Sequence, residues 1–125
     1  MSPIQPNIEF KVYEPDTQRN FQKVSIIGNI DRDTMEKART QMEVILNNLP
    51  TGSVMLDMEN LEFINSEGIG YLSDIFSRLY ADNKHLMILK ASPRIMDIFQ
   101  LVGLNQIIPC CDTEEECLAK LSQAS

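Results

Sequence analysis

Two short apolar runs constrain the fold of this 125-residue chain more than any other feature. Residues 54–58 (Val-Met-Leu-Asp-Met) and 86–89 (Leu-Met-Ile-Leu) show little alternation of apolar and polar side chains. Such continuous runs are typical of strands that are covered on both faces. The pattern therefore predicts two neighbouring inner strands of a parallel sheet. Between them, apolar residues recur at the spacing of one helix face, at Ile69, Leu72, Ile75, Phe76 and Leu79.

Further strand and helix patterns flank this unit on both sides. They predict strands at residues 8–12, 24–27 and 106–108, and helices capped by Asp33, Ser92 and Thr113. The resulting order is β-β-α-β-α-β-α-β-α. It predicts an α/β fold in which about four helices pack on a mixed, mostly parallel sheet of about five strands. We expect one domain over residues 1–125, with residues 1–6 as a flexible N-terminal tail.

The charge of the chain limits the classes of partner. Its formal net charge of −7 argues against nucleic acid or an anionic membrane surface as the main partner. No run approaches the roughly 18 apolar residues that a membrane-spanning helix needs. The first residues also lack the basic and apolar regions of a signal peptide. We therefore expect a cytosolic protein that is not inserted in a membrane.

The cysteines and the catalytic motifs predict neither a metal site nor a cofactor. Cys110, Cys111 and Cys117 have no histidine at zinc-binding spacing, so we expect reduced, partly buried thiols. The sequence contains no glycine-rich phosphate loop of the Walker or dinucleotide type, and no serine elbow between two glycines. An enzyme is therefore a weaker interpretation than a binding protein.

The stretch from Asn65 to Gly70 lies where a strand, a loop and a helix are predicted to meet. Ser66 is a suitable N-cap, and Glu67 complements the positive end of the helix dipole. Gly68 and Gly70 cost the helix roughly 1 kcal/mol each in propensity, which indicates that the helix start approaches something closely. Ser66 thus has two interpretations: a cap and nothing more, or a hydroxyl that is exposed to receive a phosphate.

Five segments together resemble the STAS domain of the anti-sigma factor antagonist family, the phosphorylatable proteins of bacterial partner-switching systems. The resemblance covers roughly residues 22–121, in the order and spacing of the family. The segments are Gly28-Asn29-Ile30-Asp31, Val54-Met55-Leu56-Asp57-Met58, Phe63-Ile64-Asn65-Ser66-Glu67-Gly68-Ile69-Gly70, Ser92-Pro93 and Val102-Gly103-Leu104.

The resemblance implies a function. An unphosphorylated family member binds a serine kinase that also acts as an anti-sigma factor, and so releases the sigma factor. The kinase uses ATP to phosphorylate a serine before the second helix, which ends binding, and a metal-dependent serine phosphatase resets the protein. By position the phosphorylated serine is Ser66. The implied partner-binding residues are Asp31, Asn65, Ser66, Glu67, Gly68, Gly70 and Tyr71.

Two positions depart from the family pattern. The residue before the serine is usually Asp and here is Asn65, while the residue after it is usually small and here is Glu67. One alternative is therefore a non-phosphorylated STAS subunit of a lipid-transport ATPase or a signalling scaffold. A second alternative is a small nucleotide-binding or phosphatase-like enzyme.

Overall fold

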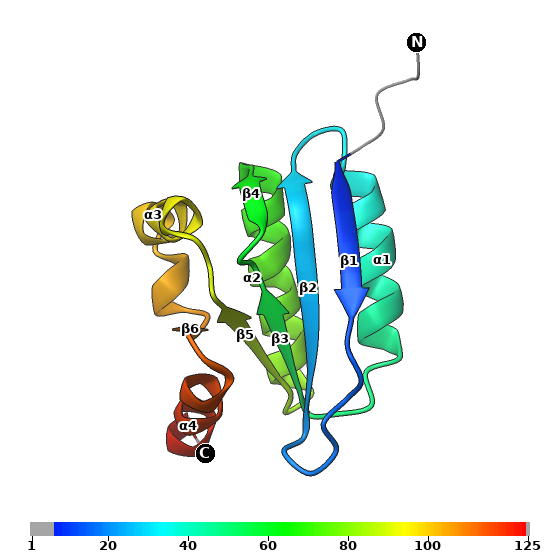
Figure 1. The fold of residues 1–125 in the computed structure, drawn as a ribbon, viewed down its shortest axis with the longest axis vertical. Helices are drawn as coiled ribbons and strands as arrows, with labels where there is room; N and C mark the ends of the chain where they lie inside the picture. Colours follow the sequence, from blue (N-terminus) through cyan, green and yellow to red (C-terminus); the bar gives the residue numbers. More distant parts are fainter. Residues whose placement is uncertain (1–6, 125) are drawn as a thin grey trace.

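A six-stranded sheet forms the centre of the computed structural model, which describes residues 7–124 (Figure 1). The predicted tail at residues 1–6 lies outside the described residues. The strand order is β1-β2-β3-β5-β6, and β4 pairs separately with β2. Only the β1–β2 pair is antiparallel. The strands are β1 (Ile8–Val12), β2 (Phe21–Ile30), β3 (Ser53–Asp57), β4 (Leu61–Ile64), β5 (His85–Leu89) and β6 (Cys110–Cys111).

The predicted α/β architecture is confirmed, with one strand more than expected. Four α-helices pack on the sheet, and Figure 1 shows α1 and α2 behind it. No helix within residues 7–124 combines the length and the apolar character needed to cross a membrane. The helices are α1 (Met35–Asn47), α2 (Ser66–Ala81), α3 (Pro93–Val102) and α4 (Glu114–Ala124), with a 3₁₀ turn η1 (Leu104–Gln106) between α3 and β6.

The two inner strands β3 and β5 are neighbours, as the apolar runs predicted. Their side chains alternate between two cores, since successive residues of a strand point to opposite faces. Leu56 and Ile88 enter the core beneath α1, α2 and α3, whereas Met55 and Met87 enter a smaller core with Cys117 of α4. Both faces are covered here, which explains why the two runs are continuously apolar.

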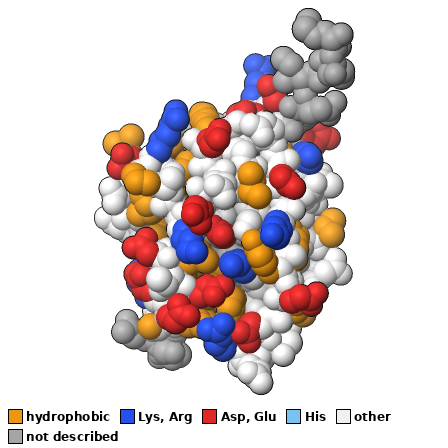
Figure 2. Space-filling model, in the orientation of Figure 1, with side chains coloured by type: hydrophobic (Ala, Val, Ile, Leu, Met, Phe, Trp, Pro, Cys, Tyr) orange, Lys and Arg blue, Asp and Glu red, His pale blue; other side chains and the backbone are white. Residues whose placement is uncertain are grey.

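The front face of β1 and β2, opposite α1 and α2, is polar. The Lys11 and Lys23 ammonium groups lie 4.9 and 4.4 Å from the centre of the Tyr13 ring. Ser25 Oγ donates a hydrogen bond to Asp57 Oδ2 at 3.3 Å. Figure 2 shows Lys and Arg side chains interspersed with Asp and Glu over the visible face. The positive charges on this face are therefore offset locally by acidic neighbours.

Strand β4 was not predicted. It occupies four residues, of which only Leu61 and Ile64 are buried, so it shows no strand alternation. It forms because β2 is ten residues long: its first half pairs with β3 and its second half with β4. Gly28, at a bulge in β2, has φ of 109° and donates to the Asn60 carbonyl at 3.0 Å. The predicted second strand, 24–27, was therefore too short.

Two further sequence predictions were wrong. The expected strand at residues 106–108 is displaced to Cys110–Cys111, because Leu104–Gln106 coil into η1 and Ile108 is buried in the core. Asp33 does not cap α1. Instead Asp31 Oδ1 accepts hydrogen bonds from the backbone N–H groups of Asp33 (2.9 Å) and Thr34 (3.1 Å), and α1 begins two residues after Asp33.

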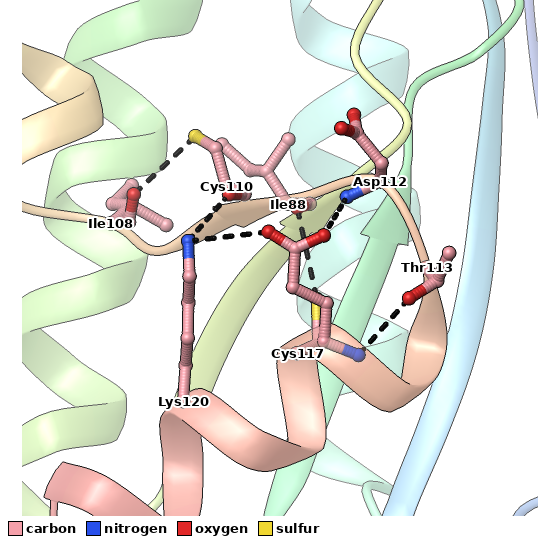
Figure 3. Close-up of polar contacts among 8 residues, drawn as sticks. Ile88, Ile108, Cys110, Asp112, Thr113, Cys117 and Lys120 are labelled. Atoms are coloured by element: carbon pink, nitrogen blue, oxygen red, sulfur yellow. Dashed lines mark hydrogen bonds and ion pairs between the residues drawn. The ribbon is translucent and has the colours of Figure 1, made fainter.

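The predicted caps at Ser92 and Thr113 are confirmed. Ser92 Oγ accepts from the Ile95 backbone N–H at 3.4 Å, and Gly103 ends α3 with φ of 80°. At the start of α4, Thr113 Oγ1 accepts from the Glu116 backbone N–H at 3.1 Å. The Glu116 carboxylate in turn accepts from the Asp112 backbone N–H at 3.2 Å, one residue before the cap, as Figure 3 shows at Asp112.

The start of α2 packs tightly on the ends of β2 and β4. A Cβ atom at Gly68 would lie 2.7 Å from Ile30 Cγ2 and 2.8 Å from Ile64 Cγ1, closer than carbon atoms can approach. Nothing lies within 4 Å of the corresponding position at Gly70. The close approach that the two glycines indicated is therefore an approach to the sheet, and Gly68 alone is required for it.

The two glycines should respond differently to alanine. We expect Gly68→Ala to lower the free energy of unfolding by about 1–2 kcal/mol, since overpacking outweighs the gain in helix propensity. Gly70→Ala should raise it by up to about 1 kcal/mol, because the new methyl group meets no neighbour. Urea denaturation followed by circular dichroism measures both. An increase in stability for both variants would contradict the packing at Gly68.

Candidate functional site

Two loops meet at the carboxyl edge of the sheet. Strand β2 ends at Ile30 and strand β4 at Ile64, and these two residues are partners in the parallel ladder. The Asn65 backbone N–H donates to the Ile30 carbonyl at 2.9 Å, which extends the pairing by one step. The residues that follow the two strands, Asp31 and Asn65, therefore lie beside each other.

Asn65, rather than Ser66, caps α2. Its Oδ1 accepts a hydrogen bond from the Gly68 backbone N–H at 2.9 Å, and its own backbone is extended. The predicted cap was wrong by one residue, because Asn and Ser cap helices about equally well and stand next to each other here. Ser66 is the first helical residue, and its side chain is exposed. Its hydroxyl therefore has no capping role to fulfil.

Asp31 is half-buried and holds the loop between β2 and α1. One carboxylate oxygen accepts from two backbone N–H groups, as described above. The loop is tied from the other side by Thr34, whose Oγ1 donates to the Asn29 carbonyl at 2.8 Å. Asp31 thus contributes a fixed negative charge beside the start of α2.

Glu67 belongs to a polar network between α1 and α2. Its Oε2 lies 3.1 Å from Arg39 Nη2, and the Arg39 guanidinium carbon lies 4.7 Å from the centre of the Tyr71 ring. The Tyr71 hydroxyl donates to Glu43 Oε2 at 2.5 Å. Arg78 donates to both Glu43 oxygens, at 3.0 and 2.6 Å. The network therefore runs from the N-terminus of α2 toward its last turn.

The centre of this network has perturbed pKa values. Hydrogen bonds from Arg78 and Tyr71 lower the pKa of Glu43 to about 2 from its ordinary 4.5. Burial raises the pKa of Tyr71, and the hydrogen bond to Glu43 raises it further. Tyr71 therefore remains a neutral donor and Glu43 a charged acceptor over the physiological pH range.

The seven predicted partner-binding residues divide into two groups. Ser66, Glu67 and Gly70 are exposed, and Asp31 and Asn65 are half-buried at the same edge. Gly68 and Tyr71 are buried in the packing of α2, where a partner would not contact them directly. Sequence reasoning missed Arg39. Glu67 and Tyr71 lie four residues apart on α2, as Arg39 and Glu43 do on α1. No local sequence pattern shows that these two helix faces are in contact.

The three cysteines belong to β6 and α4, and Figure 3 shows Cys110 and Cys117 there. Cys111 and Cys117 are buried, and Cys110 is half-buried with its Sγ donating to the Ile108 carbonyl at 3.4 Å. Burial raises the pKa of all three thiols, that of Cys110 to about 11. Lys120 Nζ donates to the Cys110 carbonyl at 2.9 Å. Cys111 and Cys117 pack α4 onto the sheet, and the raised pKa values favour the protonated form of all three thiols near neutral pH.

Alanine substitutions distinguish the cap from its neighbour. We expect Asn65→Ala to lower the free energy of unfolding by about 1 kcal/mol through loss of the cap. Ser66→Ala should change it by less than about 0.5 kcal/mol, because the hydroxyl is exposed and caps nothing. Chemical denaturation provides the comparison. A larger loss for Ser66→Ala than for Asn65→Ala would show that Ser66 is the cap.

The network predicts an acid-dependent loss of stability. Because the folded-state pKa of Glu43 lies below its ordinary 4.5, its contribution is complete above that pH and disappears as the pH falls toward 2. The pair with Arg78 is partly exposed, so we expect its loss to lower the free energy of unfolding by about 1 kcal/mol. Thermal unfolding between pH 5 and pH 2 should show a shallower decline for Glu43→Gln than for the wild type. Glu62→Gln, at an exposed position of β4, is the control and should follow the wild type.

Comparison with known proteins agrees with this architecture. The STAS domain family model matches residues 13–117. The anti-sigma F factor antagonist of Paenibacillus polymyxa is 23% identical over 112 residues, covering 90% of this chain and 96% of that protein. The anti-sigma-B factor antagonist of Listeria monocytogenes is 27% identical over 111 residues, covering 88% and 94%.

Solved structures show the same fold. Unphosphorylated SpoIIAA, an anti-sigma factor antagonist, superimposes with a TM-score of 0.70 at 22% identity, over 92% of this chain and 97% of that one. An anti-sigma factor antagonist from Mycobacterium paratuberculosis gives a TM-score of 0.78 at 19% identity, over 94% and 97%. SpoIIAA has also been solved in a phosphorylated form, with a TM-score of 0.63. With most of its length matched by the family model, this chain belongs to the STAS domain family.

Proposed function

We propose that this chain is an anti-sigma factor antagonist whose binding to an anti-sigma serine kinase is controlled by phosphorylation of Ser66. The observation that carries the proposal is the position of Ser66. Its side chain is exposed at the first position of α2, at the same edge of the sheet as Asp31, and the cap of the helix is provided by Asn65. The curated relatives named above, which bear the name of anti-sigma factor antagonist, support it.

A phosphate at this position is compatible with the fold. Phosphorylation adds about −1.5 to −2 charges and three acceptor oxygens. At a helix N-terminus the dipole and the unpaired backbone N–H groups favour such an anion. Because Ser66 points away from the core, the added group displaces no packed side chain. The partner is affected instead, since a surface that fits a neutral hydroxyl must desolvate an unpaired phosphate.

Local contacts support the proposal at the two positions that depart from the family pattern. Asn65 caps α2 as Asp would, but adds no charge beside Ser66. Glu67 does add a charge, and Arg39 offsets it at 3.1 Å. The charge of Glu67 next to Ser66 is therefore paired with Arg39, and the Asp31 carboxylate accepts hydrogen bonds from two backbone N–H groups. A kinase that approaches Ser66 meets little additional negative charge.

The proposed role is that of a binding module rather than an enzyme. Its partners are the kinase that transfers phosphate from ATP to the Ser66 hydroxyl and a metal-dependent serine phosphatase that removes it. The net charge of −7 favours protein partners with a basic face over nucleic acid. We place this cycle in the cytoplasm, where ATP and the transcription machinery are found.

Substitutions at Ser66 test the proposal with the anti-sigma serine kinase of the same bacterium as partner. Ser66→Ala should bind with the wild-type affinity but accept no phosphate, as measured by calorimetry and by mass spectrometry after incubation with ATP. Ser66→Asp should bind at least ten-fold more weakly, a loss of about 1.4 kcal/mol. The matched control is Ser77→Asp, which places the same charge on an exposed position of the same helix.

The opposite results would exclude this function. If Ser66→Asp bound as tightly as Ser77→Asp, charge at Ser66 would not control the partner. Phosphate on Ser66→Ala would place the modification elsewhere in the chain.

A further inference from the structure

Arg39 is held beside the start of α2 by two different contacts. It belongs to α1, and its guanidinium stacks over the Tyr71 ring with 4.7 Å between the guanidinium carbon and the ring centre. The ring is itself fixed, because Tyr71 is buried and its hydroxyl donates to Glu43. The second contact is the ion pair with Glu67, the residue after Ser66. A cation is thus oriented next to the proposed phosphorylation site.

The ion pair with Glu67 is exposed and replaceable. The side chains of Arg39 and Glu67 are 45% and 56% exposed, and ion pairs of this kind contribute little free energy. Among the described residues, the hydrogen bond to Glu67 is the one that the Arg39 side chain makes. A guanidinium has five N–H donors, so most of its donor capacity faces solvent.

The other nearby carboxylate does not compete for Arg39. Glu43 already accepts from the Tyr71 hydroxyl and from both terminal nitrogens of Arg78. Its oxygens are therefore occupied on the side that faces α2. Arg39 remains above the ring, with Glu67 as its acidic partner in the unphosphorylated protein.

We infer that Arg39 is the positioning residue for the phosphate on Ser66: it pairs with Glu67 before phosphorylation and transfers to the phosphate afterwards. The inference rests on the proposed function, because it concerns the phosphorylated form of Ser66. The side chains of Ser66 and Glu67 point about 100° apart, because they are consecutive residues of a helix. To reach the phosphate, the outer bonds of Arg39 must rotate while its aliphatic part stays in contact with Tyr71. A phosphate carries more charge than a carboxylate and accepts two parallel N–H bonds from arginine.

The transfer changes two groups of the binding surface at once. Before phosphorylation the partner meets a neutral hydroxyl and a Glu67 carboxylate whose charge Arg39 offsets. Afterwards it meets a phosphate held in one orientation by Arg39, and a Glu67 carboxylate without its counter-charge. An acidic residue after the serine, which departs from the family pattern, thus adds a second unpaired charge that the partner must desolvate, in the phosphorylated state only.

The experiment uses the full chain with phosphoserine introduced at position 66 during translation, so that no kinase is needed. Phosphorus NMR measures the second pKa of the phosphoserine, which is near 6 without a neighbouring cation. We expect Arg39→Gln to raise this pKa by about 0.5 relative to the wild type, as loss of a partly exposed ion pair does. Glu67→Gln should lower it, and Arg39→Lys should restore part of the wild-type value because the charge is retained.

Arg19 offers a matched control. Arg19 lies in the turn before β2, at the end of that strand opposite to the site. Its side chain is 47% exposed and pairs with Asp16 at 2.7 Å. Its guanidinium carbon lies 5.2 Å from the centre of the Phe21 ring. Arg19→Gln therefore removes an arginine of the same kind and should leave the phosphoserine pKa unchanged. The side-chain Nε–H signal of Arg39 should also shift when wild-type protein carries the phosphate, and the Arg19 signal should not.

The inference is overturned if Arg39→Gln leaves the phosphoserine pKa at the wild-type value, or if Arg19→Gln raises it equally. An Arg39 Nε–H signal that is identical with and without the phosphate would also overturn it. These outcomes concern the phosphate alone. They are distinct from failure of the proposed function, which would appear as kinase binding that does not respond to Ser66→Asp.

Discussion

The parallel pairing of β2 with β4 is the interaction on which the arrangement of the site depends. It places Ile30 opposite Ile64 and so brings the loops that follow them to one edge of the sheet. The helix start must then approach the sheet ends closely, which only a residue without a Cβ atom allows, at Gly68. Without this pairing, Asp31 and Ser66 would belong to separate loops with no common surface.

This pairing also determines how much of the site is available to a partner. Because β4 ends at Ile64 and Asn65 caps the helix, Ser66 becomes the first residue of α2 and faces solvent. Because the cap is Asn65 rather than Ser66, the Ser66 hydroxyl is accessible to solvent instead of being used in the cap. The proposed phosphorylation site thus lies at a helix N-terminus, where the dipole and the free backbone N–H groups favour added negative charge.

A second, weaker constraint comes from the polar network between α1 and α2. Its central carboxylate, Glu43, is bound by two donors and stays charged over the physiological pH range, so it acts as a fixed element. At its outer end, Arg39 and Glu67 are exposed and can exchange partners at little cost. The network thus has Glu43 at its centre, which fixes Tyr71, and the exposed Arg39–Glu67 ion pair at its end next to Ser66.

The sequence by itself determined the layers of this protein. The uninterrupted apolar runs at β3 and β5 reflect burial on both faces, and the helix periodicity of α2 reflects burial on one face. These patterns are local, so the sequence alone predicts the elements. Motif positions also located the Asn65–Ser66–Glu67 stretch. Tertiary structure decided the rest: β4 lacks alternation and exists through its pairing with β2, and the cap of α2 is Asn65 rather than the predicted Ser66. Arg39 joined the site only because α1 and α2 lie side by side, since contacts between distant segments depend on packing that no local pattern records.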